Sequence, residues 1–187
     1  MSARHSPVPG VWLMTDERLG DALWTALRRL PPGAGVVFRH YELPRPERLA
    51  LWLRVRRVAH ARGLVAVSAG EALPGADGVH RGRGRGLLTW PAHNRRQAVA
   101  AKRAGAALVF VSSVYPTRSH PGAPALGPMG AARVAQGFGM TVIALGGMNA
   151  ERWRKARRLR LDGWAGVDAW LPSRVRSGTE SRVVGPS

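Results

Sequence analysis

The sequence predicts an α/β protein, a (β/α)₈ barrel that is slightly truncated. Short apolar runs alternate with longer amphipathic stretches along the chain, which is typical of βαβ units and a parallel sheet. Eight such runs occur in 187 residues, and eight strands favour a closed barrel over the alternative, an open doubly wound sheet. Ordinary barrels need roughly 200 residues or more. We therefore expect short or missing helices after strands 3, 4 and 8.

The first two helices have the clearest signals. Apolar side chains recur at helical spacing over residues 19–30, and Pro31-Pro32-Gly33 ends this helix. Residues 46–62 predict a second helix, which separates two further apolar runs. The strands around these helices are expected at 11–15, 35–39 and 64–68. The apolar face of the second helix is expected to carry Leu51, Val55, Val58 and Ala59.

The same alternation continues with shorter elements. Two brief apolar runs stand close together and leave no room for full helices around them. Later runs are separated by helices, one of them with Asn149 as its N-cap residue. The expected strands are 78–80, 87–90, 107–112, 141–145 and 164–170, and the expected helices are 94–104, a short one ending near residue 137, and 149–160.

The composition limits the classes of protein to consider. The chain has no cysteine, which excludes disulfides and thiolate metal sites, and no apolar run approaches the roughly 20 residues of a membrane helix. The polar start lacks the apolar stretch of a signal peptide. We expect one cytoplasmic domain over residues 1–187, without a membrane partner, in which residues 1–10 and 173–187 are flexible.

The charge is strongly positive. Basic residues number 29 and acidic residues 11, so the formal net charge is +18, and such a surface attracts phosphate backbones. However, the arginines are spread over the polar sides of the predicted helices, and no known nucleic-acid-binding signature accompanies them. We interpret them mainly as solvated faces. The predicted partners are small phosphorylated molecules rather than nucleic acid.

Two loops are the strongest candidates for binding. Parallel barrels bind ligands at the C-terminal ends of their strands. Gly146-Gly147 follow the seventh predicted strand and open a helix, where close backbone approach and free N–H groups suit a phosphate. Residues 112–124 contain hydroxyls, a cation and an imidazole, which suit a clamp on a phosphorylated substrate. Alternatively, the first is only a tight turn and the second only a proline-rich connector.

Both loops also resemble a known family. VYPTRSHPGAPALG at 114–127 and VIALGGMNAE at 142–151 are similar to motifs of the thiamine phosphate synthase and thiazole tautomerase (TenI) superfamily. WLMTD at 12–16, GADGVH at 75–80 and RAGAALVFV at 103–111 match in the same order. The resemblance implies a (β/α)₈ barrel of thiamine biosynthesis. It also implies a transferase that joins hydroxymethylpyrimidine diphosphate to a thiazole phosphate and releases pyrophosphate with magnesium.

The resemblance assigns roles to seven residues. Gly146 and Gly147 would bind the thiazole phosphate through backbone N–H groups. The diphosphate would be gripped by Thr117, Ser119 and Arg39. His120 stands where the family has a lysine, and it is a weaker, pH-dependent cation. The candidates for positive charge in catalysis are His120 and Arg85.

The magnesium positions of the family are altered in this chain. Ser68-Ala69 replace an Asn-Asp pair, Arg85 replaces an aspartate, and Asp168 replaces a phosphate-binding serine. An active enzyme of this family would need magnesium, but we predict no metal ligand here. The arginines of RGRGRG, residues 81–86, could neutralise a diphosphate directly. Alternatively, this segment is a basic loop that remained after the carboxylates were lost.

Two functions within this family therefore stay open, beside the weaker interpretation of the chain as an RNA-associated basic protein. The first is a thiamine phosphate synthase-like transferase whose activity these replacements would impair. The alternative is a non-catalytic or tautomerase-like barrel that binds a thiazole phosphate. The catalytic histidine of the tautomerase branch aligns with Ser113, which counts against tautomerase chemistry.

Overall fold

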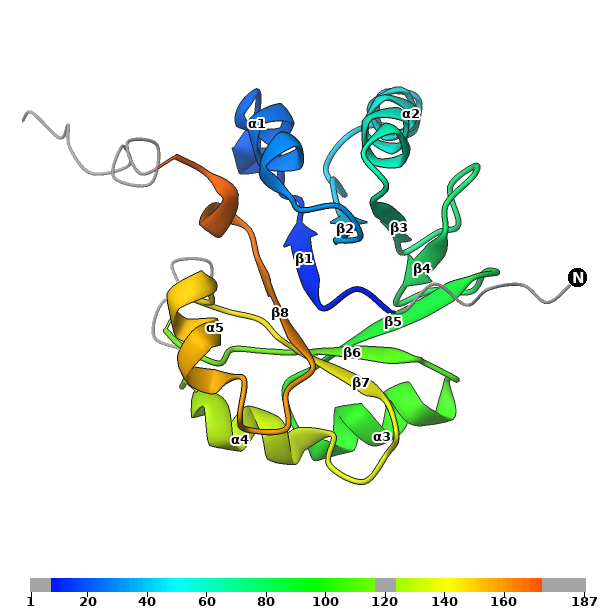
Figure 1. Cartoon of the computed structure of the whole chain (residues 1–187). Coiled ribbons are helices and arrows are strands. Elements are labelled where there is room, and N and C mark those ends of the chain that lie inside the picture. Colours follow the sequence, from blue (N-terminus) through cyan, green and yellow to red (C-terminus); the bar gives the residue numbers. More distant parts are fainter. Residues whose placement is uncertain (1–7, 117–123, 173–187) are drawn as a thin grey trace, which may run out of the picture.

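The protein is a closed barrel of eight parallel strands (Figure 1). The computed structural model describes residues 8–116 and 124–172. Each strand pairs with the next, and β8 closes the barrel against β1. The predicted (β/α)₈ fold is confirmed. The strands are β1 (Val11–Met14), β2 (Gly35–Phe38), β3 (Val65–Ala69), β4 (Gly78–His80), β5 (Leu87–Ala92), β6 (Leu108–Val111), β7 (Thr141–Ala144) and β8 (Gly163–Gly166).

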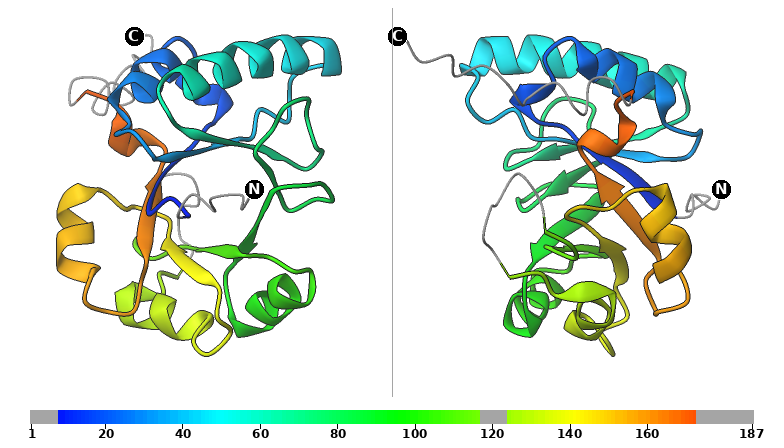
Figure 2. Two further views of the ribbon diagram at one scale, coloured as in Figure 1. Left: turned by 45° about the vertical axis from the view of Figure 1, so that its right-hand side comes forward. Right: turned by 90° about the vertical axis from the view of Figure 1, so that its left-hand side faces the viewer.

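Helices cover only part of the barrel. No α-helix follows β3, β4 or β8 within the described residues, which confirms the predicted truncation, and loops stand beside β4 instead (Figure 2). None of the helices in residues 8–116 and 124–172 has the length and apolar character needed to cross a membrane. The α-helices are α1 (Ala22–Arg29), α2 (Arg45–Ala61), α3 (Arg95–Arg103), α4 (Gly127–Val134) and α5 (Ala150–Ala156), and the short 3₁₀ helices are η1 (Glu17–Leu19) and η2 (Asp168–Trp170).

Three predicted elements differ from the structure. The helix expected over 19–30 is divided, because Gly20 has a φ of 45° between η1 and α1. The helix expected to reach residue 160 ends at Ala156. The strand expected over 164–170 ends at Gly166, since the chain turns into η2 and stacks Trp170 on Trp164 with ring centroids 4.8 Å apart.

Large side chains fill the interior of the barrel. Trp12 of β1 is fully buried and meets Phe110 of β6 edge to face, with ring centroids 5.3 Å apart. Its indole lies directly over Gly35 of β2, where an added Cβ would overlap the ring. The indole N–H donates to the Pro9 carbonyl at 2.6 Å. The barrel is therefore closed by a packed plug, and the position beside the plug requires glycine. Interior residues of this cluster are Trp12, Met14, Val37, Val67, Ala69, Leu108, Phe110, Ile143 and Ala165.

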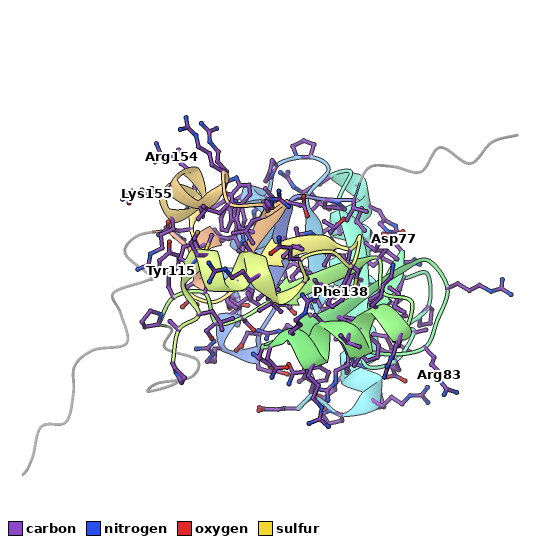
Figure 3. All side chains as sticks on the ribbon, turned by 90° about the horizontal axis from the view of Figure 1, so that it is seen from below. Asp77, Arg83, Tyr115, Phe138, Arg154 and Lys155 are labelled. Atoms are coloured by element: carbon purple, nitrogen blue, oxygen red, sulfur yellow. The ribbon has the colours of Figure 1, made fainter. Side chains whose placement is uncertain are left out.

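The RGRGRG segment lies flat on the barrel in place of a helix. Its three glycines face inward: Cβ atoms at these positions would overlap the Gly70 carbonyl, the Val79 side chain and the Asp77 carbonyl, in that order. Its three arginines are exposed, and Arg83 points away from the barrel in Figure 3. The alternation of arginine and glycine in this segment therefore reflects a backbone with one edge against the barrel and the other edge in solvent.

A buried arginine joins the ends of β2 and β3. Arg48 of α2 donates to the carbonyls of His40 at 2.9 Å and Ala69 at 2.7 Å, and to the Glu71 carboxylate at 2.8 Å. It is 7% exposed. Arg48 is thus part of the packed face of α2, together with Trp52, Val55 and Ala59. Leu51 and Val58, which were expected on that face, are only half-buried.

We expect Arg48→Met to lower the free energy of unfolding by about 2 kcal/mol, because two buried carbonyls lose their donor while most of the packing volume stays. Arg45→Met is the matched control, since Arg45 is exposed and lies 3.8 Å from the same Glu71; its expected effect is within about 0.5 kcal/mol. Urea unfolding of both variants measures the difference. Equal losses would show that the bonds of Arg48 to the two carbonyls contribute nothing.

Candidate functional site

The C-terminal ends of the eight strands form one end of the barrel, which we call the mouth. Side chains alternate between the two faces of a strand, so residues directly after the strands alternate between the interior and the outer layer. The mouth brings together Asp16 after β1, Arg39 after β2, His80 at the end of β4, Ser112 after β6 and the glycine pair after β7. His80 is paired within the sheet, and the other positions follow the ends of paired strands by one to three residues.

The glycine turn touches the base of the predicted clamp loop. The Val114 N–H donates to the Leu145 carbonyl at 2.9 Å, and the Tyr115 N–H donates to the Gly146 carbonyl at 3.1 Å. Gly146 and Gly147 have φ angles of 90° and 62°, which favour glycine. A Cβ on Gly147 would lie 2.8 Å from the Pro116 carbonyl oxygen. The two loops singled out in the sequence are therefore adjacent where the structure describes both.

Three predicted site residues cannot be placed. Thr117, Ser119 and His120 lie outside the described residues, which end at Pro116 and resume at Pro124. Their predicted roles in gripping a diphosphate remain predictions. Ser113, the position of the tautomerase histidine, is described: its Cα would lie 2.9 Å from a Cβ on Gly146. The hydroxyl residue at that position therefore packs against the glycine turn.

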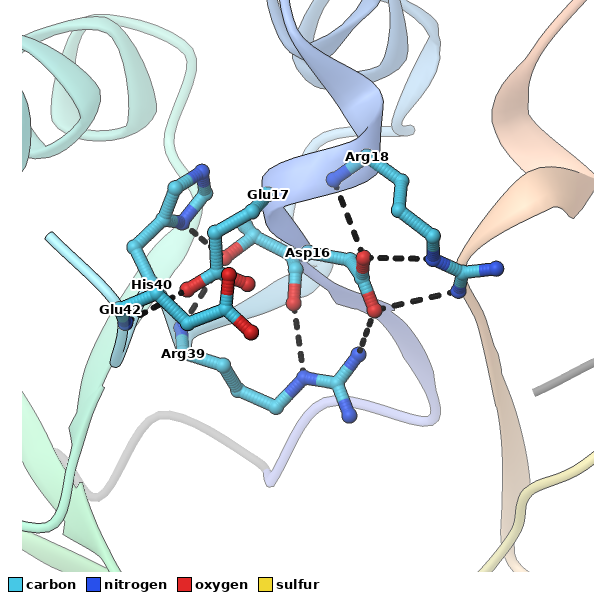
Figure 4. A network of polar contacts seen from close by, with 7 residues as sticks. Asp16, Glu17, Arg18, Arg39, His40 and Glu42 are labelled. Carbon is cyan, nitrogen blue, oxygen red and sulfur yellow. Dashed lines mark hydrogen bonds and ion pairs between the residues drawn. The ribbon is translucent and has the colours of Figure 1, made fainter. Parts of the chain in front are cut away.

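Arg39 lies at the mouth but already has a carboxylate partner. Its Nη2 is 3.2 Å from Asp16 Oδ2, and its Nε donates to the Thr15 carbonyl at 2.7 Å (Figure 4). Asp16 also accepts two hydrogen bonds from the Arg18 guanidinium, at 2.7 and 3.1 Å. Burial raises the pKa of Asp16, but the hydrogen bonds and charge of Arg18 and the charge of Arg39 outweigh burial and hold it below its usual value. A diphosphate bound to Arg39 would compete with Asp16.

Arg85 is not at the mouth. The Leu87 N–H donates to the Asp77 carbonyl at 2.9 Å, and Leu87 begins β5. Because all strands are parallel, the start of β5 is at the end of the barrel opposite the mouth. Arg85 lies two residues before that start and is exposed. The structure therefore does not bring Arg85 together with Arg39, Gly146 or Gly147, whereas Arg81 follows β4 directly and lies at the mouth.

The positions aligned with magnesium ligands do not fit magnesium. The buried Ser68 hydroxyl donates to the Glu71 carbonyl at 2.7 Å and accepts from the Leu73 N–H at 3.2 Å. Ala69 offers no oxygen in its side chain, and Arg85 is a cation at the wrong end. No group of three or more His, Asp or Glu side chains in the described ranges could hold a metal ion, whereas magnesium prefers oxygen ligands with carboxylates among them.

His80 is a buried neutral imidazole at the mouth, and sequence reasoning gave it no role. Its Nδ1 is 2.9 Å from Thr89 Oγ1, and its ring meets Phe110 with centroids 5.5 Å apart. Burial, together with the charges of Arg39 and Arg81, lowers the pKa of His80 to about 4. The imidazole is therefore uncharged at neutral pH and presents a polar group in the interior without adding to the positive charge of the mouth.

This pKa predicts a pH dependence of stability. In the unfolded chain a histidine binds a proton near pH 6.5, whereas folded His80 does so only near pH 4. The unfolded state thus binds more protons than the folded state between these two pH values. The stability that neutral His80 contributes is therefore lost as the pH falls from about 6.5 to about 4. We expect the free energy of unfolding to fall less over this interval in His80→Gln than in the wild type. The same fall in both proteins would contradict the assignment.

Sequence reasoning also missed Arg152. It is in the first turn of α5, after Asn149, whose side chain accepts from the Arg152 N–H at 2.8 Å. The guanidinium turns back toward the glycine turn, donates from Nη1 to the Gly147 carbonyl and lies over the Tyr115 ring, 4.5 Å from its centroid. The only sequence signal was the position of a cation close after the glycine pair, and many surface arginines share such a position. Because it contacts both Gly147 and Tyr115, the Arg152 guanidinium lies between the two candidate loops.

Comparisons with known proteins agree with this fold. A family model described as thiamine monophosphate synthase matches residues 76–170. Thiamine-phosphate synthase of Pyrococcus furiosus is 28% identical over 89 residues, covering 47% of this chain and 43% of the relative. Thiamine-phosphate synthase of Geobacillus thermodenitrificans is 36% identical over 109 residues, covering 50% and 49%. The matched stretch of the chain thus spans about half the length of these curated relatives.

Solved structures extend the likeness to nearly the whole chain. A thiamine phosphate pyrophosphorylase from Pyrococcus furiosus superposes with a TM-score of 0.77 at 21% identity and covers 94% of both chains. A structure titled "Native KDPGal structure" gives 0.56 at 14% identity, covering 97% of this chain and 90% of the other. At these identities the structures show a shared barrel fold. Since the family model covers just over half of the sequence, the chain belongs to the thiamine monophosphate synthase/TenI family.

Proposed function

We propose that this chain binds a thiazole phosphate, or a closely related phosphomonoester, at the glycine turn of the barrel mouth. The observation that carries the proposal is the contact between the two loops: the base of the loop after β6 is hydrogen-bonded to the turn after β7. This contact holds the two loops next to each other at the mouth. The names of the curated relatives support thiamine phosphate metabolism as the setting, and we propose the cytoplasm as its location.

The glycine turn has the donors that a phosphate needs. In the described part of the chain, the N–H groups of Gly146 and Gly147 have no hydrogen-bond acceptor, while their carbonyls accept from Tyr115 and Arg152. Both glycines have positive φ angles, and backbone N–H groups that lack an acceptor can donate to a bound anion. Lack of side chains at both positions allows close approach.

The diphosphate half of the family reaction has weaker support. Arg39 shares its charge with Asp16, Arg85 is at the opposite end, and the aligned positions do not suit magnesium. We therefore propose binding without group transfer as the first function, and no step of it uses magnesium. Transfer of the pyrimidine group remains the second candidate. The family match and the location of Arg39 at the mouth favour it, with Thr117, Ser119 and His120 as predicted contributors.

One experiment separates these possibilities. The chain is titrated calorimetrically with hydroxyethylthiazole phosphate, and then incubated with this compound and hydroxymethylpyrimidine diphosphate, with and without millimolar magnesium. Thiamine phosphate and pyrophosphate are both measured. Saturable binding without product supports the first function, whereas equal amounts of both products establish the transferase. Absence of both binding and product would overturn both proposals.

A further inference from the structure

The side chain of Arg152 stands beside the glycine turn and forms no ion pair with a carboxylate among residues 8–116 and 124–172. We infer that Arg152 contacts the phosphate and makes the site prefer a phosphorylated ligand to the corresponding alcohol. The inference rests on the proposed function and names the residue that would set the ligand class.

The position of Arg152 is fixed from two sides. Its Nη1 donates to the Gly147 carbonyl, and its guanidinium lies over the Tyr115 ring at 4.5 Å. One contact is with the turn after β7 and the other is with the loop after β6. The side chain is half-buried, so its charge is screened less than that of a fully exposed arginine. A cation held in this way loses little conformational entropy when an anion binds.

The charge of Arg152 has no carboxylate partner in the described ranges, in contrast to Arg39 and Arg48, the other arginines of the mouth that are not exposed. Arg39 pairs with Asp16, and Arg48 pairs with Glu71. The neighbour of Arg152 in sequence, Glu151, pairs instead with Lys155 at 2.8 Å. An acidic partner is therefore provided at the other two positions and not at Arg152, as expected where an external anion neutralises the charge.

The guanidinium retains donors for such an anion. It carries five N–H groups in a planar fork, and the Gly147 carbonyl uses one of them. The same fork geometry binds phosphate oxygens in pairs. The Gly147 N–H belongs to the peptide next to the carbonyl that Arg152 holds. The guanidinium therefore lies close to this N–H group, and the two kinds of donor together suit a dianionic phosphomonoester better than a neutral hydroxyl.

Calorimetric titration of the full chain tests this role with three probes: hydroxyethylthiazole phosphate, the unphosphorylated hydroxyethylthiazole and inorganic phosphate. We expect Arg152→Gln to weaken binding of the phosphate ester about 10- to 100-fold. Binding of inorganic phosphate to this variant should weaken by a similar factor. The unphosphorylated alcohol should bind to it as tightly as to the wild type. Arg152→Lys keeps the charge and should recover part of the loss.

Arg154→Gln is the matched control, because Arg154 is on the same helix and points away from the barrel (Figure 3). It should bind all three probes like the wild type. Equal weakening of ester and alcohol in Arg152→Gln would show that Arg152 only holds the loops together, and would overturn the inference. No weakening in either Arg152 variant would overturn it as well. If the wild type binds no phosphate ester, the proposed function fails first and the inference fails with it.

Discussion

Gly35→Ala is expected to lower the free energy of unfolding by at least about 3 kcal/mol, which is the upper range for overpacked cores. The added Cβ would overlap the indole ring of Trp12, which is fully buried and in contact with Phe110. The ring has no space to move into, because neighbouring strands close around it. Denaturant unfolding followed by tryptophan fluorescence measures the loss.

Two further variants identify the cause of that loss. Gly130→Ala, in the interior of α4, places its Cβ 3.4 Å from the Leu126 side chain, and it should be neutral or slightly stabilising, as alanine is the better helix former. In a Trp12→Leu background, Gly35→Ala should cost less than half as much, since the smaller side chain leaves room. If the cost is unchanged in that background, contact with the indole is not its origin.

Gly147→Ala is expected to weaken binding of hydroxyethylthiazole phosphate more than about 100-fold. Its φ of 62° disfavours any side chain. The new Cβ would also lie 2.8 Å from the Pro116 carbonyl oxygen and 2.9 Å from both Tyr115 Cβ and Arg152 Nη1. Relief of these contacts moves the loop after β6 away from the turn, which separates the groups that bind the phosphate. Calorimetric titration measures the change in affinity.

Gly139→Ala is the control for Gly147→Ala, because it introduces the same backbone strain at a place outside the glycine turn. Gly139 has a φ of 67°, close to that of Gly147, but an added Cβ would meet nothing within 4 Å. This control should lose only the stability that a side chain at positive φ costs, and it should keep wild-type affinity. A Gly147→Ala protein that binds the ester normally would show that the turn does not form the phosphate site.

Much of the fold could be predicted because local sequence determines it. Apart from the half-buried β5, the strands are short apolar runs buried on both sides. Turn residues or helices separate the strands, so seven of their positions follow from the pattern to within about two residues. The last strand was predicted too long, because Trp170 extends the apolar run. Its ring instead stacks on Trp164 after the chain has turned. Stacking between elements leaves no signal in the local spacing.

The candidate site could be predicted only in part. The location of Gly146 and Gly147 follows from their place after a strand, and the adjacent loop follows from parallel topology. Arg39 and Arg48 each pair with a carboxylate that is 23 positions away in the sequence. Arg81 and Arg85 are only four positions apart in the sequence. They nevertheless lie at opposite ends of the barrel, because the segment that joins them runs back along β4. Such placements depend on the folded path of the chain.

A crystal structure of the chain with hydroxyethylthiazole phosphate tests the central claim most directly, namely that the glycine turn at the barrel mouth binds the phosphate. We predict phosphate oxygens within hydrogen-bond distance of the Gly147 N–H and of the Arg152 guanidinium, with the thiazole ring directed over the interior side chains of the mouth. A phosphate bound at the opposite end of the barrel, or at the mouth without contact to the turn, would contradict it.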